Sequence, residues 1–229
     1  MRVALIIPAL NEEDSIARTI RSLPAGVFTQ VIVADNGSAD RTTERAEAAG
    51  ATVVREPRRG YGAACLAALA ALPDSIEAVV FMDADGSDDP ADLPLLLAPL
   101  ERDEADLVLG SRELGEAEPG ALTPQQRAGN RLASFLLRWL WGYRFTDLGP
   151  YRAIRRTSLE SLAMRDTNYG WTIEMQIKAV RRGVRIREVG VRCRRRRAGR
   201  SKVSGSLWGG LAAGAKILWT VARQSWASS

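Results

Sequence analysis

The sequence predicts an α/β fold, a single domain in which helices flank a central, mostly parallel sheet. Short apolar runs rich in β-branched residues alternate with helical patterns of about ten residues, as in chains built from βαβ units. With 229 residues, the chain is long enough to bury one sizeable core. Its apolar content of 46% and charged content of 26% are ordinary for a soluble globular protein.

The first half of the chain carries the clearest strand and helix patterns. Apolar runs predict strands at Val3–Ile7, Val31–Ala34, Thr52–Val54, Ala78–Met82 and Asp106–Leu109. Helical patterns lie between them at Asp14–Leu23, Asp40–Ala49, Ala63–Leu72 and Ala91–Leu100. Because ligands of parallel sheets bind beyond the carboxyl ends of the strands, we expect the loops that follow the first four strands to meet at one edge.

The second half is less regular. We expect a mobile loop at Glu113–Thr123, because this stretch contains Gly and Pro and has no apolar period. Helices are predicted at 124–142 and about Trp171–Arg182, and strands at Tyr151–Ile154 and Val184–Val191. In the tail, apolar residues at steps of three or four predict an amphipathic helix, which either packs on the core or lies in a membrane interface.

Composition and charge exclude several kinds of chemistry. The chain has no histidine, which excludes Ser-His-Asp and Cys-His catalysis and histidine-ligated metals. Its two cysteines lie far apart, without ligand spacing, which indicates a reducing compartment. Residues 1–120 carry 10 Lys and Arg and 22 Asp and Glu, a net charge of −12; residues 121–229 carry 22 and 5, a net charge of +17. An acidic half could hold a cation and a basic half could hold anions, so the two together suit a metal–diphosphate substrate. The basic half would also suit nucleic acid or an anionic membrane.

The most informative motif is Asp83-Ala84-Asp85, which follows the apolar run at Ala78–Met82. Alternate side chains of a strand point the same way, so the two carboxylates should project together where the strand ends. Adjacent carboxylates stay ionised most readily with a cation between them, and hard oxygen ligands favour Mg²⁺ or Mn²⁺ shared with substrate phosphates. The alternative is an acidic, solvated turn.

Three more loops with polar and small residues follow the other strands. These loops are Pro8–Glu13, Asp35–Thr42 and Glu56–Ala64. With Asp83-Ala84-Asp85 they resemble the loops of family 2 glycosyltransferases, which have the GT-A (nucleotide-diphospho-sugar transferase) fold. Within that family the resemblance is to the polyprenol-phosphate (dolichol-phosphate) mannosyl- and glucosyltransferases, and it runs from Val3 to about Lys202. Later segments share it: Gly110–Arg112, Thr146–Arg152, Trp171–Met175 and Arg197–Lys202.

The resemblance implies roles for individual residues. It places the base, ribose and diphosphate of a nucleotide sugar against Pro8, Ala9, Leu10, Glu12, Asp35, Gly62, Asp83, Ala84, Arg112, Arg200 and Lys202. It implies that Asp83 and Asp85 hold the metal, with Ser87 as a third candidate ligand, and that Asp85, Arg112 and Asp147 are the catalytic candidates. The chain departs from the family at Asn36, where a second Asp is common, and at Gly86-Ser87-Asp88 in place of Leu-Gln-His.

The implied organisation is a transferase domain at 1–205, with a nucleotide-binding half at 1–112 and an acceptor-side half at 113–205, followed by the amphipathic helix at 206–229. The implied reaction is inverting, metal-dependent transfer of a hexose from GDP-mannose or UDP-glucose to a polyprenyl or dolichyl phosphate. An acceptor phosphate is already anionic and needs little help from a base. A hydroxyl acceptor would need one, for which Asp147 is the first candidate and Glu174 the second.

Other functions stay open at this point. One is transfer to a small soluble acceptor, and a more distant one is nucleotidyl transfer, although its Gly-rich first loop is missing. A remote one is nucleic-acid binding by the basic run Arg192–Lys202, which lacks interleaved aromatic residues. We expect a cytoplasmic protein that binds no nucleic acid, with peripheral contact to the inner face of the cell membrane and homo-oligomer formation as open alternatives. No run of about 20 apolar residues predicts a membrane span.

Overall fold

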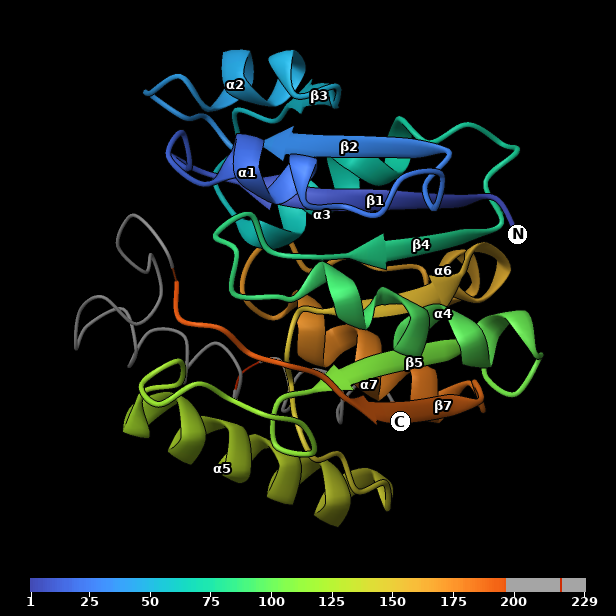
Figure 1. Cartoon of the computed structure of the whole chain (residues 1–229). Coiled ribbons are helices and arrows are strands. Elements are labelled where there is room, and N and C mark those ends of the chain that lie inside the picture. Colours follow the sequence, from blue (N-terminus) through green and yellow to red (C-terminus); the bar gives the residue numbers. More distant parts are fainter. Residues whose placement is uncertain (197–218, 220–229) are drawn as a thin grey trace.

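The computed structural model describes residues 1–196 and residue 219, and in this part the chain forms one seven-stranded sheet (Figure 1). Its strands are β1 (Val3–Ala9), β2 (Gln30–Asp35), β3 (Thr52–Arg55), β4 (Ala78–Phe81), β5 (Leu107–Ser111), β6 (Arg152–Arg155) and β7 (Ile186–Gly190). Their order across the sheet is β3-β2-β1-β4-β6-β5-β7. Strands β1 to β4 pair in parallel, β6 is antiparallel to β4 and β5, and β7 is parallel to β5. The predicted mostly parallel sheet is confirmed.

The helices are α1 (Ile16–Arg21), α2 (Thr42–Ala48), α3 (Tyr61–Ala70), α4 (Leu93–Glu101), α5 (Pro124–Trp141), α6 (Arg156–Leu162) and α7 (Trp171–Arg181), with a short 3-10 turn at Pro90–Asp92. The elements that the sequence predicts within the described residues begin and end within one or two residues of the observed bounds. Helix α6 was not predicted. It has seven residues and follows β6 directly, so no loop separates the two elements in the sequence.

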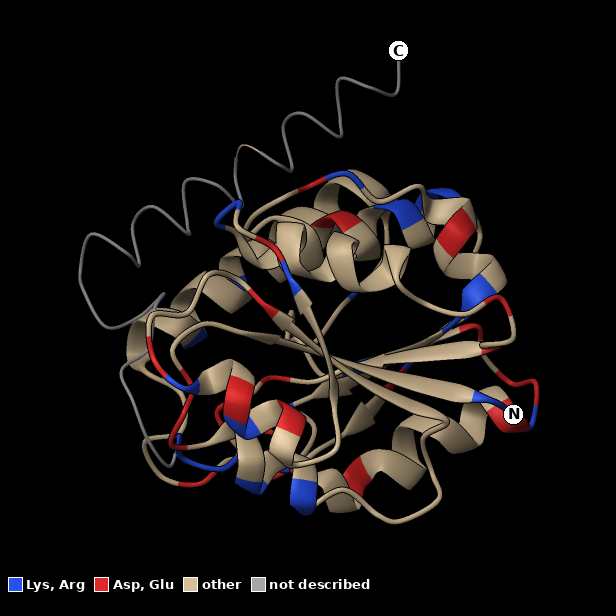
Figure 2. Cartoon of the chain, turned by 90° about the horizontal axis from the view of Figure 1, so that it is seen from above, with Lys and Arg blue, Asp and Glu red and all other residues tan. Residues whose placement is uncertain are grey.

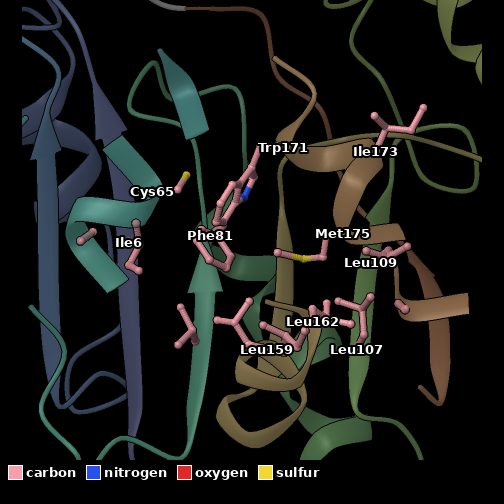
Figure 3. Packing of buried hydrophobic residues seen from close by; sticks show 14 of the residues in the cluster. Ile6, Cys65, Phe81, Leu107, Leu109, Leu159, Leu162, Trp171, Ile173 and Met175 are labelled. Atoms are coloured by element: carbon pink, nitrogen blue, oxygen red, sulfur yellow. The ribbon is translucent and has the colours of Figure 1, made fainter. Parts of the chain in front are cut away.

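Two apolar layers cover the two faces of the sheet, so that the sheet lies between helices (Figure 2). Alternation along β1 divides its side chains between the layers, with Ile6 facing one and Ile7 the other. The Ile6 layer contains residues of α3, α5, α6 and α7, and the rings of Phe81 and Trp171 meet edge to face there with centroids 6.1 Å apart (Figure 3). The Ile7 layer contains residues of α1, α2 and α4. The domain is therefore a three-layer α/β/α sandwich.

The strand directions bring the loops of interest to one edge. Strands β1 to β4 are parallel, and β5 runs in the same direction as β4 because β6 is antiparallel to both. The loops after β1, β2, β3, β4 and β5 therefore leave the sheet at the same edge, where a parallel α/β sheet holds its ligands.

Helix α5 begins at a capping box, in which the side chain of Thr123 accepts the backbone N–H of Gln126 and the side chain of Gln126 accepts that of Thr123. The helix ends at Gly142, whose backbone is in the left-handed region. It buries Ala133 and Leu137 against the core. The side of the helix away from the core carries Leu132, Phe135 and Trp139, which are all exposed, Phe135 at 63% and Trp139 at 75%. None of the helices in the described part of the chain has both the length and the apolar content that crossing a membrane requires.

Candidate active site

Asp83 and Asp85 lie directly beyond β4, in a turn that folds back on itself. The backbone N–H of Asp83 donates to Oδ2 of Asp88 over 2.9 Å, and the backbone N–H of Ser87 donates to Oδ1 of Asp85 over 2.9 Å. These two bonds hold the carboxylates of Asp83, Asp85 and Asp88 within one turn. The structure thus gathers three carboxyl groups at the carboxyl end of a strand.

The carboxylates in this turn raise one another's pKa. Burial, followed by the charges of Asp88 and Asp85, raises the pKa of Asp83 well above its ordinary value. Burial also raises the pKa of Asp88 to about 7, with the charge of Asp85 adding to the shift. Arg112 and Arg196 oppose the shift at Asp83, because positive charge favours the ionised carboxylate. A divalent cation between Asp83 and Asp85 would act in the same sense, so this donor set of hard oxygens fits Mg²⁺ or Mn²⁺.

A cavity of about 630 Å³ opens beside this turn. The predicted site residues that line it are Pro8, Ala9, Leu10, Glu12, Asp83, Ala84, Asp85, Ser87 and Arg112. Asp35, Gly62 and Asp147 do not line it. Arg200 and Lys202, and the predicted helix at 206–229 apart from residue 219, lie outside the described residues. The loops after β1, β4 and β5 thus meet around one cavity of the size that holds a small ligand.

The loop after β1 is fixed by its neighbours. The backbone N–H of Glu12 donates to Oγ1 of Thr42 over 2.8 Å, and the hydroxyl of Ser15 donates to Oε2 of Glu12 over 2.9 Å. Glu12 is almost completely buried, and its other carboxylate oxygen pairs with Arg196. Glu12 therefore lies in the cavity wall as a charged and fully engaged group.

At the end of β2, Asp35 and Asn36 organise the backbone. The N–H of Ser38 donates to both carboxylate oxygens of Asp35, over 3.2 and 3.3 Å. The Asn36 amide donates to the carbonyls of Glu56 and Arg58, and its oxygen accepts the N–H of Gly60 over 2.7 Å. Of these two residues only Asn36 lines the cavity. The amide thus joins the loops after β2 and β3, because it both donates and accepts, which a carboxylate in its place would not do.

Gly62 packs against backbone rather than facing the cavity. A Cβ atom at Gly62 would lie 2.0 Å from the carbonyl oxygen of Asp166, and one at Gly60 would lie 2.0 Å from that of Thr167. The N–H of Ala63 donates to the Thr167 carbonyl over 2.9 Å. These glycines allow α3 to approach the loop that precedes α7. The cavity lining that follows β3 comes from Arg59, Gly60, Tyr61 and Ala64 instead.

Arg112 and Asp147 form a two-point ion pair beside the cavity. Nε and Nη2 of Arg112 donate to the two carboxylate oxygens of Asp147 over 2.6 and 2.7 Å, and the Arg112 backbone N–H adds a third bond of 2.9 Å. Burial alone would raise the pKa of Asp147, but the hydrogen bonds and charge of Arg112 outweigh burial and hold this pKa below its ordinary value. Asp147 fixes the guanidinium of Arg112, and Arg112 lines the cavity.

Glu174 is buried in a structural network. Its carboxylate accepts the backbone N–H groups of Arg165 and Asp166 and pairs with Lys178 at 2.7 Å. Glu174 does not line the cavity. Glu174 lies one turn after the start of α7, and it orders the loop before α7, which packs on α3.

Several cavity residues were not predicted, among them Arg59, Tyr61, Gln126, Tyr169, Arg195 and Arg196. Within the basic run Arg192–Lys202, only Arg200 and Lys202 were predicted individually as site residues. In the structure Arg192 pairs with Asp92, and Arg194 with Asp89, over 2.8 and 2.5 Å. Arg196 instead pairs with Glu12 and Asp85 in the cavity wall. Because most residues of this run are arginines, the sequence does not indicate which arginine pairs with which carboxylate.

Comparisons with known proteins agree with this geometry. The model of the family described as Glycosyl transferase family 2 matches residues 4–163. An uncharacterized glycosyltransferase of Mycobacterium tuberculosis is 40% identical over 212 residues, which cover 92% of this chain and 94% of the relative. The undecaprenyl-phosphate mannosyltransferase of Micrococcus luteus is 33% identical over 221 residues, covering 91% and 90%. The crystal structure of glucosyl-3-phosphoglycerate synthase from Mycobacterium tuberculosis, in complex with Mn²⁺, UDP and glucosyl-3-phosphoglycerate, matches with a TM-score of 0.79 at 29% identity, covering 98% of this chain and 80% of that one.

Proposed function

Because the chain belongs to glycosyl transferase family 2 and is a glycosyltransferase, we propose that it transfers a hexose from UDP-glucose or GDP-mannose to a polyprenyl phosphate, with inversion at the anomeric carbon. One observation carries this proposal. Asp83, Asp85, Glu12 and Arg112 converge on a single cavity at the carboxyl edge of the sheet. Acidic groups at one wall and a fixed guanidinium at another suit a metal-bound diphosphate with a second anion beside it.

Asp83 and Asp85 would hold the divalent cation, with Ser87 as a third candidate ligand. Within the described residues, no three His, Cys, Asp or Glu side chains form a metal-binding cluster. Two carboxylates therefore provide the protein's share, as is usual for Mg²⁺ sites completed by water and substrate phosphates. Bound there, the cation would stabilise the charge of the departing diphosphate. Structural relatives crystallised with Mn²⁺ or Mg²⁺ and UDP support this assignment.

Arg112 would bind the acceptor phosphate or the donor diphosphate, since a guanidinium held by a carboxylate on one side can donate on its other side. We assign Asp147 the role of a positioning residue for Arg112. Its low pKa and its two engaged oxygens make it a poor general base. Glu174 is also a poor candidate for a base, because its carboxylate accepts backbone N–H groups away from the cavity. A phosphate acceptor is already ionised, so its transfer would need neither Asp147 nor Glu174 as a base.

A lipid acceptor is supported by helix α5. Thr123 and Gln126 at its start line the cavity, and the exposed row Leu132, Phe135 and Trp139 continues along the same helix. Exposed arginines flank this row at Arg127, Arg131 and Arg138. Apolar and aromatic side chains bordered by basic ones are typical of helices that lie in a membrane interface. A lipid phosphate held in a bilayer would then enter the cavity from the α5 side. The mannosyltransferase relative, whose name gives undecaprenyl phosphate as its acceptor, supports the same class.

A second candidate is transfer of glucose to a small phosphorylated acid. The observation that favours it is the structural match to glucosyl-3-phosphoglycerate synthase, which was crystallised with UDP-glucose, Mn²⁺ and phosphoglyceric acid. Both acceptors present a phosphate, so Arg112 would serve either one. The exposed apolar row on α5 has no use in this candidate, which is why we rank it second.

The acceptor is tested by radiolabelled sugar transfer with Mn²⁺. UDP-glucose and GDP-mannose are each incubated with undecaprenyl phosphate in detergent or with 3-phosphoglycerate. We expect label to move into the organic phase with undecaprenyl phosphate. Label in a water-soluble product with phosphoglycerate alone would establish the second candidate. Transfer to neither would contradict both acceptors.

A further inference from the structure

The guanidinium of Arg196 lies where two acidic loops meet. Its Nη2 pairs with Oε1 of Glu12, from the loop after β1, and its Nη1 lies 3.3 Å from Oδ2 of Asp85, from the loop after β4. The Arg196 side chain is 22% exposed, and both carboxylates are less exposed than that. A positive charge is therefore placed against the carboxylate that we assign to the metal.

Arg196 differs in this from the other described arginines of its run. Arg192 and Arg194 pair with Asp92 and Asp89, which do not line the cavity. The side chain of Arg195 donates to the backbone carbonyl of Pro119. Among the described residues 192–196, Arg196 alone forms an ion pair with carboxylates of the cavity wall. Of these arginines, only Arg196 is therefore placed to affect the binding of a cation at Asp85.

Both oxygens of Asp85 are engaged in this arrangement. Oδ1 accepts the backbone N–H of Ser87 within the turn, which leaves Oδ2 as the oxygen that faces Arg196. A divalent cation binds a carboxylate oxygen at about 2.0–2.2 Å. A guanidinium and a dication on the same oxygen would repel each other, so Arg196 weakens the binding of a divalent cation at Oδ2.

We infer that Arg196 is a counter-cation built into the chain, which neutralises Glu12 and Asp85 until a divalent cation replaces it at Asp85. The inference rests on the proposed function in that it takes Asp85 as a metal ligand. The affinity for the metal is then lowered, because the contact between Arg196 and Asp85 must break before the cation can bind.

The test is a Mn²⁺ titration of the full chain without nucleotide, followed by the electron paramagnetic resonance signal of free Mn²⁺. Arg196→Gln removes the charge and leaves a shorter, uncharged polar side chain. We expect this variant to bind Mn²⁺ roughly fivefold more tightly than the wild type, the size of effect that a partly buried ion pair gives. The matched control is Arg187→Gln. Arg187 lies on β7 and pairs with Glu104, so the loss of its charge should leave Mn²⁺ affinity unchanged.

A thermal unfolding measurement provides the second readout. Without metal, Arg196→Gln should unfold at a lower temperature than the wild type, and saturating Mn²⁺ should narrow the difference, because the cation then supplies the missing charge. Should Arg196→Gln fail to fold, Arg196→Lys takes its place and should bind Mn²⁺ about twofold more tightly, since an ammonium cannot contact both carboxylates as a planar fork does.

The outcomes separate the inference from the proposed function. If the wild type binds Mn²⁺ and the charge-removing variant binds it equally or more weakly, Arg196 does not compete with the metal and the inference is wrong. If the wild type binds no Mn²⁺, with or without UDP-glucose or GDP-mannose, the proposed metal site is wrong and the inference falls with it.

Discussion

Arg112 and Asp147 are joined by three hydrogen bonds although 35 residues separate them in the chain. Arg112 directly follows β5, and Asp147 precedes β6, the strand that pairs with β5. The neighbouring strands bring the two residues together at the carboxyl edge of β5. A two-point ion pair of this kind fixes the plane of the guanidinium, so its remaining N–H groups present a constant geometry to a ligand in the cavity.

Replacement of this carboxylate tests whether it positions or reacts. In Asp147→Asn one acceptor oxygen becomes a donor and the two-point pair is lost, so we expect kcat/KM for the nucleotide sugar to fall about 10- to 100-fold. A positioning role predicts the same factor at every pH from about 6 to 9, which steady-state kinetics over that range would measure. A factor that grows towards one end of the range would indicate a general base instead. Asp74→Asn, at an exposed carboxylate paired with Arg156, should leave the kinetics unchanged.

The close approach of α3 to the loop before α7 makes a prediction about stability. Gly62→Ala would place a methyl group 2.0 Å from the Asp166 carbonyl, so the backbone must shift and the free energy of unfolding should fall by about 2 kcal/mol. Gly129→Ala is the matched control, because a Cβ there meets nothing within 4 Å and the site lies inside helix α5. That change should stabilise the protein by about 0.5–1 kcal/mol. Urea unfolding of both variants measures the difference. Equal stabilities would contradict the backbone contact.

The exposed row on α5 predicts binding to lipid surfaces. The double variant Phe135→Ser/Trp139→Ser should reduce co-sedimentation with anionic vesicles roughly tenfold at low salt, because two large apolar side chains are lost from the interface. Its melting temperature should stay near that of the wild type, since both side chains are mostly exposed. Leu95→Ser, at an exposed leucine of α4, is the control and should sediment like the wild type. A wild-type protein that stays entirely in the supernatant would contradict the membrane role of α5.

At the opposite edge of the sheet, Arg185 pairs with Asp103 and Asp106 over 2.6 and 2.8 Å. Hydrogen bonds from Arg185 lower the pKa of both carboxyls below 3.8. A lowered pKa in the folded state stabilises the fold above the unfolded pKa, and this contribution disappears as the pH falls through the folded pKa. Arg185→Gln should therefore melt about 1–3 °C below the wild type at pH 7, and the difference should disappear as the pH falls through the lowered pKa of the two carboxyls.

Scanning calorimetry over this pH range checks this, with Arg131→Gln on the exposed side of α5 as a control that should show no such trend. A difference between Arg185→Gln and the wild type that persists or grows at low pH would contradict the assignment of these carboxyls as the partners of Arg185.

The fold and the position of the acidic turn could be predicted because they depend on local patterns. The apolar run that ends before Asp83 places this turn after a strand, and parallel strands place their loops at one edge. Contacts between distant parts of the chain carry no such pattern. The bonds between Arg112 and Asp147, and the choice of Arg196 over its neighbours as the partner of Asp85, depend on the completed fold.

Two further differences between the predicted and the observed structure also arise because contacts between distant parts of the chain leave no local pattern. Helical periodicity shows that α5 is amphipathic, but it does not show that Phe135 and Trp139 lie on the exposed side. Loop sequences show which residues are near the edge of the sheet, but not which side chains turn inward, so Asp35 and Gly62 were predicted to contact the nucleotide sugar while Asn36, Arg59 and Tyr61 line the cavity.

The central claim is that Asp85 binds the metal of a sugar-transfer site, and release of nucleoside diphosphate tests it most directly. Wild-type protein and Asp85→Asn are incubated with UDP-glucose or GDP-mannose, undecaprenyl phosphate and Mn²⁺, with Asp14→Asn, at an exposed carboxylate of the same half, as the control. We predict Mn²⁺-dependent release of UDP or GDP by the wild type and the control, and a rate at least about 100-fold lower for Asp85→Asn. Equal release by Asp85→Asn, or no release by the wild type from either donor, would contradict the claim.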